Sequence, residues 1–309
     1  MLGRLFFIFL FGFFYVNLSS GLKAQEAPKA KQNSIEAWAT KDATSRTGLL
    51  FKDADPAIYA LARKIERKEP ISLEEVKALP DGSVNARYGE DITFLFHALA
   101  MHNTKAVDIL LQAGADPYMV ARSNRRSRLN LPYYLGFPGS DDLSDEGYEY
   151  MAELIRIYLK NGGDPNYRFA DKGQSLIWHV TLIGNYKGTR MLLDAGADPL
   201  VMDANGMAAV LTLSGINSHP EARELLREII CKGYYDHADM EYVKKILLYL
   251  TPLGPDDPEK EAVNRKFAMR ILRNHHDYKD DIATQEHFNG PIPWKDILNE
   301  GEGDVCNGF

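Results

Sequence analysis

The chain has 309 residues, of which 45% are hydrophobic, so it is long enough to bury a large core. Its formal net charge of −7 and its sequence pI of about 5.7 argue against nucleic acid as the main partner. Two cysteines, Cys231 and Cys306, permit one disulfide, but the sequence leaves open whether they are bonded or remain two free thiols.

The first 24 residues have the pattern of a secretory signal peptide. Arg4 precedes an apolar run over residues 5–18, and small polar residues then provide a cleavage site. This run is shorter than a membrane-spanning helix, which needs about 20 residues. We therefore expect a cleaved signal, a periplasmic protein and an N-terminal lead-in over 25–52. An uncleaved membrane anchor is the alternative.

Two stretches of the chain repeat each other at an offset of 82 residues. Residues 93–117 and 175–199 each contain an apolar helix start, a Leu-Leu pair and a closing Gly-Ala-Asp-Pro, and a related Gly-Gly-Asp-Pro stands at 162–165. The glycine allows the positive φ that ends a helix, and Asp-Pro prevents the helix from continuing. Such spacing indicates supersecondary units, each of which buries its apolar face against its neighbour.

The units resemble the ankyrin repeat, whose pattern is Gly-x-Thr-Pro-Leu-His-x-Ala followed by a second helix ending in Leu-Leu and Gly-Ala-Asp. Residues 173–180 match the opening with substitutions, and residues 192–198 match the close. A degenerate unit over 203–233 and a weaker first unit over about 57–85 bring the expected number to five.

The resemblance implies an all-α fold, with an ankyrin-repeat α-solenoid over residues 53–233. The third unit is longer than the others, and we expect its extra residues to form a long loop, an insertion over about 124–147. Helical patterns continue after Gly233, so residues 234–309 are expected to form a helical C-terminal cap and tail.

The sequence contains no glycine-rich phosphate loop, no nucleophile elbow and no zinc-protease helix motif. The cysteines lack the spacing of a zinc site. His179 stands at a repeat position that tolerates many residues, which favours a structural role over catalysis or metal binding, and His97 is expected to be a packing position. We therefore expect no enzymatic activity, no cofactor and no metal.

The third-unit insertion is one candidate surface for binding a partner protein. A basic block is followed there by aromatic and acidic blocks, and arginine and tyrosine are residue types that anchor interfaces. An insertion that packs on the stack, with its charges paired internally, is the alternative. The candidate residues are Arg122, Arg125, Arg126, Arg128, Tyr133 and Tyr134.

A second candidate surface follows from the resemblance, since hairpin tips and first helices of ankyrin repeats form a concave face that binds proteins. Exposed apolar side chains on that face would be open to a partner, unless the insertion or the C-terminal helices cover them. Carried over position by position, the candidates are Glu90, Ile92, Met101, Asp171, Lys172, Gln174, Leu182, Ile183, Asn205 and Met207.

The resemblance extends to exported ankyrin proteins that are paired with toxic effectors of contact-dependent systems such as type VI secretion. It implies an immunity protein that sterically blocks an effector enzyme, for instance a phospholipase. A general periplasmic scaffold that supports envelope or oxidative-stress enzymes is the alternative.

Overall fold

The computed structural model describes five stretches of the chain and a few positions near the C-terminus. They are residues 43–124, 127–136, 144–169, 173–215 and 219–235, together with 238, 242, 270, 286–287, 290–291 and 306. The expected signal peptide and most of the expected C-terminal cap lie outside these residues. Within the described ranges, none of the helices combines the length and the apolar character needed to cross a bilayer.

The described residues are mainly helical, which confirms the all-α class, with two short antiparallel hairpins in addition. The helices are α3 (Ala43–Leu50), α4 (Pro56–Glu66), α5 (Leu73–Lys77), α6 (Phe94–Ala100), α7 (Thr104–Gln112), α8 (Leu131–Gly136), α9 (Asp145–Lys160), α10 (Leu176–Leu182), α11 (Tyr186–Asp194), α12 (Ala209–Gly215) and α13 (Pro220–Cys231), and the 3-10 turns are η1 (Ser83–Asn85) and η2 (Gly89–Asp91). Strands β1 (Ala121–Asn124) and β2 (Ser127–Leu129) form one hairpin, and β3 (Glu286–His287) and β4 (Gly290–Pro291) form the other.

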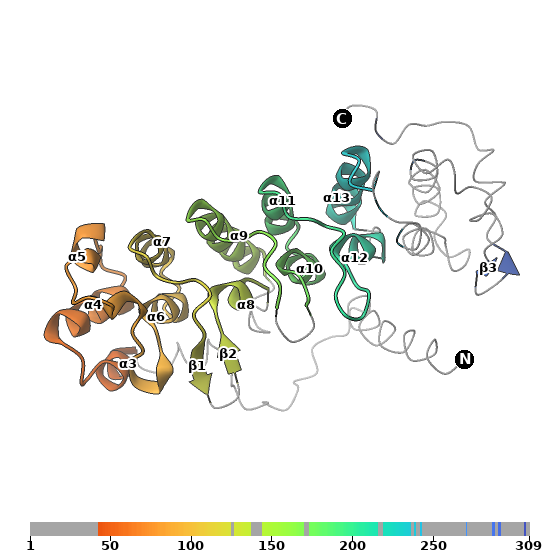
Figure 1. The fold of residues 1–309 in the computed structure, drawn as a ribbon. Helices are drawn as coiled ribbons and strands as arrows, with labels where there is room; N and C mark the ends of the chain where they lie inside the picture. The colour runs from red at the N-terminus through yellow and green to blue at the C-terminus, as the bar shows by residue number, and fades with distance from the viewer. Residues whose placement is uncertain are drawn as a thin grey trace, which may run out of the picture.

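From α4 onward, successive helices form pairs that stack side by side (Figure 1). First helices pack on first helices, as α10 does on α8 and α12, and second helices pack on second helices, as α9 does on α7 and α11. We call these two layers the first-helix row (α4, α6, α8, α10, α12) and the second-helix row (α5, α7, α9, α11, α13). In Figure 1 the second-helix row is the upper layer.

The helices of different pairs begin with equivalent side-chain caps. The hydroxyl groups of Thr93 and Ser175 accept a hydrogen bond from the backbone N–H three residues later, at the starts of α6 and α10. The side-chain oxygens of Asn103 and Asn185 cap α7 and α11 in the same way. Each cap satisfies a backbone donor that the helix itself leaves unpaired, so equivalent residues start equivalent helices.

The ends of the units also share one local structure. The Oδ1 atoms of Asp116, Asp164 and Asp198 each accept a hydrogen bond of 2.8 Å from the N–H two residues later. The glycine two positions before each aspartate has positive φ, between 81° and 92°. The Gly-x-Asp-Pro closes therefore stop the second helices as the sequence predicts.

Hydrogen bonds between the closes fix the spacing of neighbouring units. The Asn85 side chain accepts from the N–H of Asp116 (2.8 Å) and donates to the carbonyl two residues earlier (2.9 Å). Asn166 makes the same two bonds to the following unit. At the junction between them, the Tyr118 hydroxyl takes the place of an asparagine and accepts from the N–H of Asp164 (2.8 Å).

The third close contains two glycines because Tyr158 fills the space of a side chain. A methyl group at Gly163 would overlap the Tyr158 ring. The equivalent positions in the second and fourth units are Ala115 and Ala197, and a leucine stands five residues before each of them. The change of alanine to glycine therefore accompanies the change of leucine to tyrosine.

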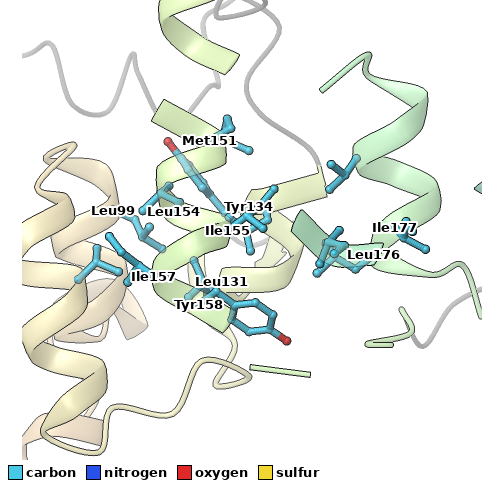
Figure 2. Packing of buried hydrophobic residues seen from close by; sticks show 14 of the residues in the cluster. Leu99, Leu131, Tyr134, Met151, Leu154, Ile155, Ile157, Tyr158, Leu176 and Ile177 are labelled. Atoms are coloured by element: carbon cyan, nitrogen blue, oxygen red, sulfur yellow. The ribbon is translucent and has the colours of Figure 1, made fainter. Parts of the chain in front are cut away.

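A continuous apolar core runs through the stack, between the two rows. Figure 2 shows its middle part, where α8 and α9 lie between α6 and α10. The labelled side chains are Leu99, Leu131, Tyr134, Met151, Leu154, Ile155, Ile157, Tyr158, Leu176 and Ile177. Each unit thus buries its apolar face against its neighbours.

The expected lead-in ends in a helix that packs on the stack. Phe51, which follows α3, is 1% exposed, and its ring centroid lies 5.4 Å from that of Phe94 and 5.1 Å from that of His97. Thr47 is fully buried, and its Oγ1 lies 3.5 Å from Nε2 of His97. Ordered packing therefore starts before residue 53, where the sequence analysis placed the first unit.

The described residues of the third-unit insertion, expected as a long loop over about 124–147, belong largely to secondary structure, and residues 125–126 and 137–143 lie outside the described residues. Strands β1 and β2 pair before α8, and α9 has 16 residues against 9 in α7 and in α11. The extra turns of α9 hold both neighbouring units. The Tyr148 hydroxyl donates to the carbonyl of Ile183 (2.8 Å), and the Tyr150 ring stacks on His102 at 4.8 Å.

The two cysteines are bonded to each other. The Cα atoms of Cys231 and Cys306 lie 5.4 Å apart, and the bond links positions separated by 75 residues. Cys231 is the last residue of α13, so the disulfide ties the C-terminal tail to the last described helix pair.

Candidate functional site

The second-helix row uses much of its charge in ion pairs between neighbouring units. Lys160 of α9 pairs with Asp108 of α7 at 2.8 Å. Arg190 of α11 pairs with Glu228 of α13, whose side chain is almost fully buried. These charges are matched within the stack, whereas the opposite side carries the first-helix row and the β1–β2 hairpin.

Three of the apolar residues expected on the concave face are buried, so their assignment to a binding surface was wrong. Ile92 is 0% exposed and Met207 9%, and both belong to the apolar core, while Met101 is 7% exposed. The backbone of Ile92 pairs with Tyr88 across the turn before α6. Ile92 is therefore part of the packing between units and offers no area to a partner.

The other residues expected on this face have different environments. Leu182 is 45% exposed, Ile183 is half-buried, and Glu90 and Asn205 are exposed. The Gln174 side chain lies 3.2 Å from Nε2 of His179 and so takes part in an internal contact. Asp171 and Lys172 lie outside the described residues.

Helix α3 and Phe51 cover part of the first-helix row. They pack against α4 and η2, and Phe51 lies over the His97 side of α6. In Figure 1, α3 lies below α4 and α6, on the same side of the stack as the β1–β2 hairpin. Among the described residues, α3 and Phe51 therefore cover the end of the first-helix row that carries α4 and α6.

Both repeat histidines are internal and uncharged at neutral pH. Burial lowers the pKa of His97 to about 4, although the Ala62 carbonyl, 3.1 Å from Nε2, acts in the opposite direction. Burial also lowers the pKa of His179 to about 4, against the attraction of Asp203. Across the stretches that the structure describes, no three His, Cys, Asp or Glu side chains are grouped as a metal site would require.

A surface of half-buried tyrosines lies at the base of the β1–β2 hairpin. The Tyr118 and Tyr167 rings are stacked with their centroids 5.4 Å apart, and Tyr118 is 37% exposed. Tyr167 and Tyr133 each meet the ring of Phe169 edge-on, at 5.2 and 6.0 Å. We call Tyr118, Tyr133 and Tyr167 the tyrosine surface. Tyr134, which was expected beside them, is only 6% exposed and belongs to the core.

Asn130 connects the three tyrosines. Its Oδ1 accepts from the N–H of Tyr133 (2.9 Å), which caps α8. Its Nδ2 donates to the hydroxyl of Tyr167 (2.9 Å) and to the carbonyl of Tyr118 (3.4 Å). Asn130 itself is 8% exposed, so one buried amide fixes both the end of the hairpin and the tyrosine surface.

The hairpin itself carries the basic block. Arg122 and Arg128 are register partners in the β1–β2 ladder. Arg125 and Arg126 lie outside the described residues, between the two strands. Figure 1 shows the hairpin extending away from the first-helix row, and in the chain the hairpin lies between Tyr118 and Tyr133 of the tyrosine surface.

No family model matches this chain, and no curated protein is similar to it in sequence.

A hollow of about 730 Å³ lies at the other end of the described stack, next to the disulfide-linked helix. Its lining includes Asp198, Leu200, Lys232 and Tyr234. Leu200 stands two residues after Asp198. The equivalent residue after Asp164 is Asn166, whose side chain bonds to the next unit. Lys232 is paired with the buried Glu228 at 2.7 Å, so the main charge of the hollow is used within the fold.

The sequence analysis found Tyr133 and the arginines but missed Tyr118, Tyr167 and Asn130. A signal for Tyr118 was present, because it stands two residues after the aspartate of a close, as Asn166 does. An alignment of the Gly-x-Asp-Pro segments would have shown that the junction at Tyr118 has a tyrosine in place of the asparagine found at Asn166. Asn130 had no such signal for its link to the tyrosine surface, since its bonds to the Tyr118 carbonyl and the Tyr167 hydroxyl join distant parts of the chain.

We expect Asn130→Ala to lower the free energy of unfolding by about 2 kcal/mol, because it removes a helix cap and leaves buried groups unpaired. Urea unfolding followed by circular dichroism measures the change. The matched control is Asn205→Ala, an exposed asparagine bonded within its own turn, for which we expect a change within about 0.5 kcal/mol. Equal losses for both variants would contradict the role assigned to Asn130.

Proposed function

We propose that this chain is an exported, ankyrin-type repeat protein that binds another protein in the periplasm. The observation that carries the proposal is the repeated junction, in which Asn85 and Asn166 make the same pair of hydrogen bonds to the next unit. Repeating junctions of this kind produce an extended surface, which is what repeat proteins use for binding. The N-terminal sequence pattern supports export.

We further propose that the partner is a toxic effector enzyme and that the chain is its immunity protein. The resemblance to ankyrin proteins paired with such effectors, and the acidic composition of an exported chain, support this choice. Inhibition would be steric: the third-unit hairpin and the tyrosine surface would cover the cleft of the enzyme. A contact of this kind needs an interface of roughly 1,600 Å² in total.

The test is affinity capture by the tagged, exported protein from periplasmic extract and from the secretions of neighbouring strains, followed by mass spectrometry. An exported, tagged protein of unrelated fold is the control bait. One near-stoichiometric enzyme that loses activity when the purified chain is added supports the immunity role. Capture of resident envelope enzymes that stay active favours the general scaffold, and capture of nothing above the control bait contradicts both.

A further inference from the structure

Two exposed arginines make equivalent hydrogen bonds in two different units. Arg87 and Arg168 each stand two residues after a junction asparagine. The Nη1 atom of Arg87 donates to the carbonyl of Val120 at 2.6 Å, and the Nη2 atom of Arg168 donates to the carbonyl of Met202 at 2.8 Å. Each arginine is thus attached to the backbone of the following unit.

These bonds hold the guanidinium groups in place and leave them able to bind a ligand. The Nε atom of Arg168 also donates to the carbonyl of Gly173 at 2.9 Å, so two segments fix this side chain. Both arginines are nevertheless exposed, and a guanidinium has five N–H donors, more than these bonds use. A side chain that is already held loses less conformational entropy when a partner binds it.

The charges of the two arginines are not neutralised by carboxylates. Within the stretches that the structure describes, neither side chain has an Asp or Glu partner. The exposed Arg67 and Arg156, by contrast, pair with Glu69 and Glu153. A backbone carbonyl has no net charge, so it leaves the positive charge of a guanidinium in place. The group that matches this charge and the planar shape of a guanidinium is a carboxylate.

An exposed aromatic ring belongs to the unit between the two arginines. The Tyr118 ring is 37% exposed and stacks on the ring of Tyr167 at 5.4 Å. Tyr167 directly precedes Arg168, and Tyr118 stands two residues before Val120, whose carbonyl binds Arg87. Tyrosine and arginine are the residue types that contribute most to the affinity of protein interfaces.

The spacing of the two arginines predicts the form of the ligand. The units stack side by side (Figure 1), and Arg87 and Arg168 are two units apart. Packed helices in a layer lie about 8 to 10 Å apart, so equivalent positions two units apart are separated by roughly 16 to 20 Å. An extended chain rises about 3.3 Å per residue, so two of its carboxylates match this distance when they stand about five or six residues apart.

We propose that Arg87, Tyr118 and Arg168 form a docking row for an extended, acidic segment of a partner protein. One carboxylate of the segment would bind each arginine, and an apolar side chain between the carboxylates would contact the Tyr118 ring. This inference rests on the proposed protein-binding function and names the chemistry of the partner segment.

The test compares two fluorescently labelled peptides of identical composition, with two glutamates either about six or about two positions apart. We expect the widely spaced peptide to bind the purified, exported protein at least about fivefold more tightly in fluorescence anisotropy, because it reaches both arginines. Raising the salt from about 50 to about 300 mM should weaken this binding. Replacing the leucine between its glutamates by serine should weaken it too.

Arg87→Gln/Arg168→Gln removes both charges but keeps an amide that can donate to the same carbonyls. This variant should bind the widely spaced peptide no better than the closely spaced one, and either single change should remove most of the preference. The matched control, Arg67→Gln/Arg156→Gln, makes the same change in net charge at paired arginines and should keep the preference. The thermal unfolding transition of each variant separates lost contacts from lost folding.

Equal binding of the two peptides, binding of neither, or the same loss in the control variant would overturn the proposal. Tighter binding of a labelled single-stranded oligonucleotide than of the widely spaced peptide would also overturn it. Capture of an effector enzyme by the unmodified chain and equally by Arg87→Gln/Arg168→Gln would leave the proposed function standing and refute the docking row alone.

Discussion

Lowering the pH from about 7 to about 4.5 should reduce the free energy of unfolding by roughly 2 to 3 kcal/mol at each of two buried histidines. His97 and His179 have pKa values near 4 in the fold, whereas an exposed histidine has a pKa of about 6.5. Below pH 6.5 these two histidines take up protons in the unfolded chain but not in the folded chain. The stability that the two neutral, buried histidines contribute is therefore complete above pH 6.5 and is lost as the pH falls towards 4.

The measurement is urea unfolding of the unmodified protein and of His97→Gln, His179→Gln and the double variant at several pH values. Carboxylates also titrate in this range, so the decisive quantity is the difference in pH dependence between each variant and the unmodified protein. The free energy of unfolding of each single variant should depend less steeply on pH than that of the unmodified protein, and that of the double variant should depend least steeply. The control, His219→Gln, changes an exposed histidine and should follow the unmodified curve. Parallel curves for all proteins would show that neither buried histidine resists protonation.

Gly163→Ala should lower the free energy of unfolding by about 3 kcal/mol, although alanine is the residue that two other units have at this position. The added methyl group overlaps the Tyr158 ring. The ring has little room to move, because Tyr158 is 1% exposed and its hydroxyl donates to the carbonyl of Asp164 at 2.9 Å. The same hydroxyl lies 3.2 Å from that of Tyr118, so the tyrosine surface should shift as well.

The double variant Tyr158→Leu/Gly163→Ala gives the third close the residue pair of its neighbours. We expect it to be more stable than the sum of the two single changes implies, by about 1 to 3 kcal/mol of coupling in a double-mutant cycle. Denaturant unfolding of the four proteins provides this quantity. The control is Ala115→Gly, which opens space beside a leucine and should show no such coupling with Tyr158→Leu. Additive changes in both cycles would contradict the packing argument.

The features that the sequence predicted well are those set by neighbouring residues. The helix starts near Thr93 and Ser175 and the closes at Asp116 and Asp198 depend on bonds that span only two or three positions. Their residues therefore indicate the starts and ends of helices without knowledge of the rest of the fold. The interpretation of His97 as a packing position agrees with its burial, whereas His179 was expected only at a tolerant repeat position and is also buried.

The features that the sequence did not predict depend on contacts between distant segments. Phe51 packs on His97 across 46 residues, and nothing near Phe51 in the chain indicates a partner. Ile92 and Met207 were assigned to the surface because family positions were carried over without the packing that buries them in this chain. The disulfide was undecidable because it requires Cys231 and Cys306 to meet across 75 residues.

The packing of α3 has a consequence for the order in which the chain can fold. Synthesis from the N-terminus delivers Thr47 well before His97, from which it is separated by 50 residues. During that interval Phe51 has no aromatic partners, because Tyr88 and Phe94 also follow later. Helix α3 and Phe51 therefore stay unpacked until the chain of the second helix pair has followed. Its docking would complete the N-terminal end of the stack rather than start it.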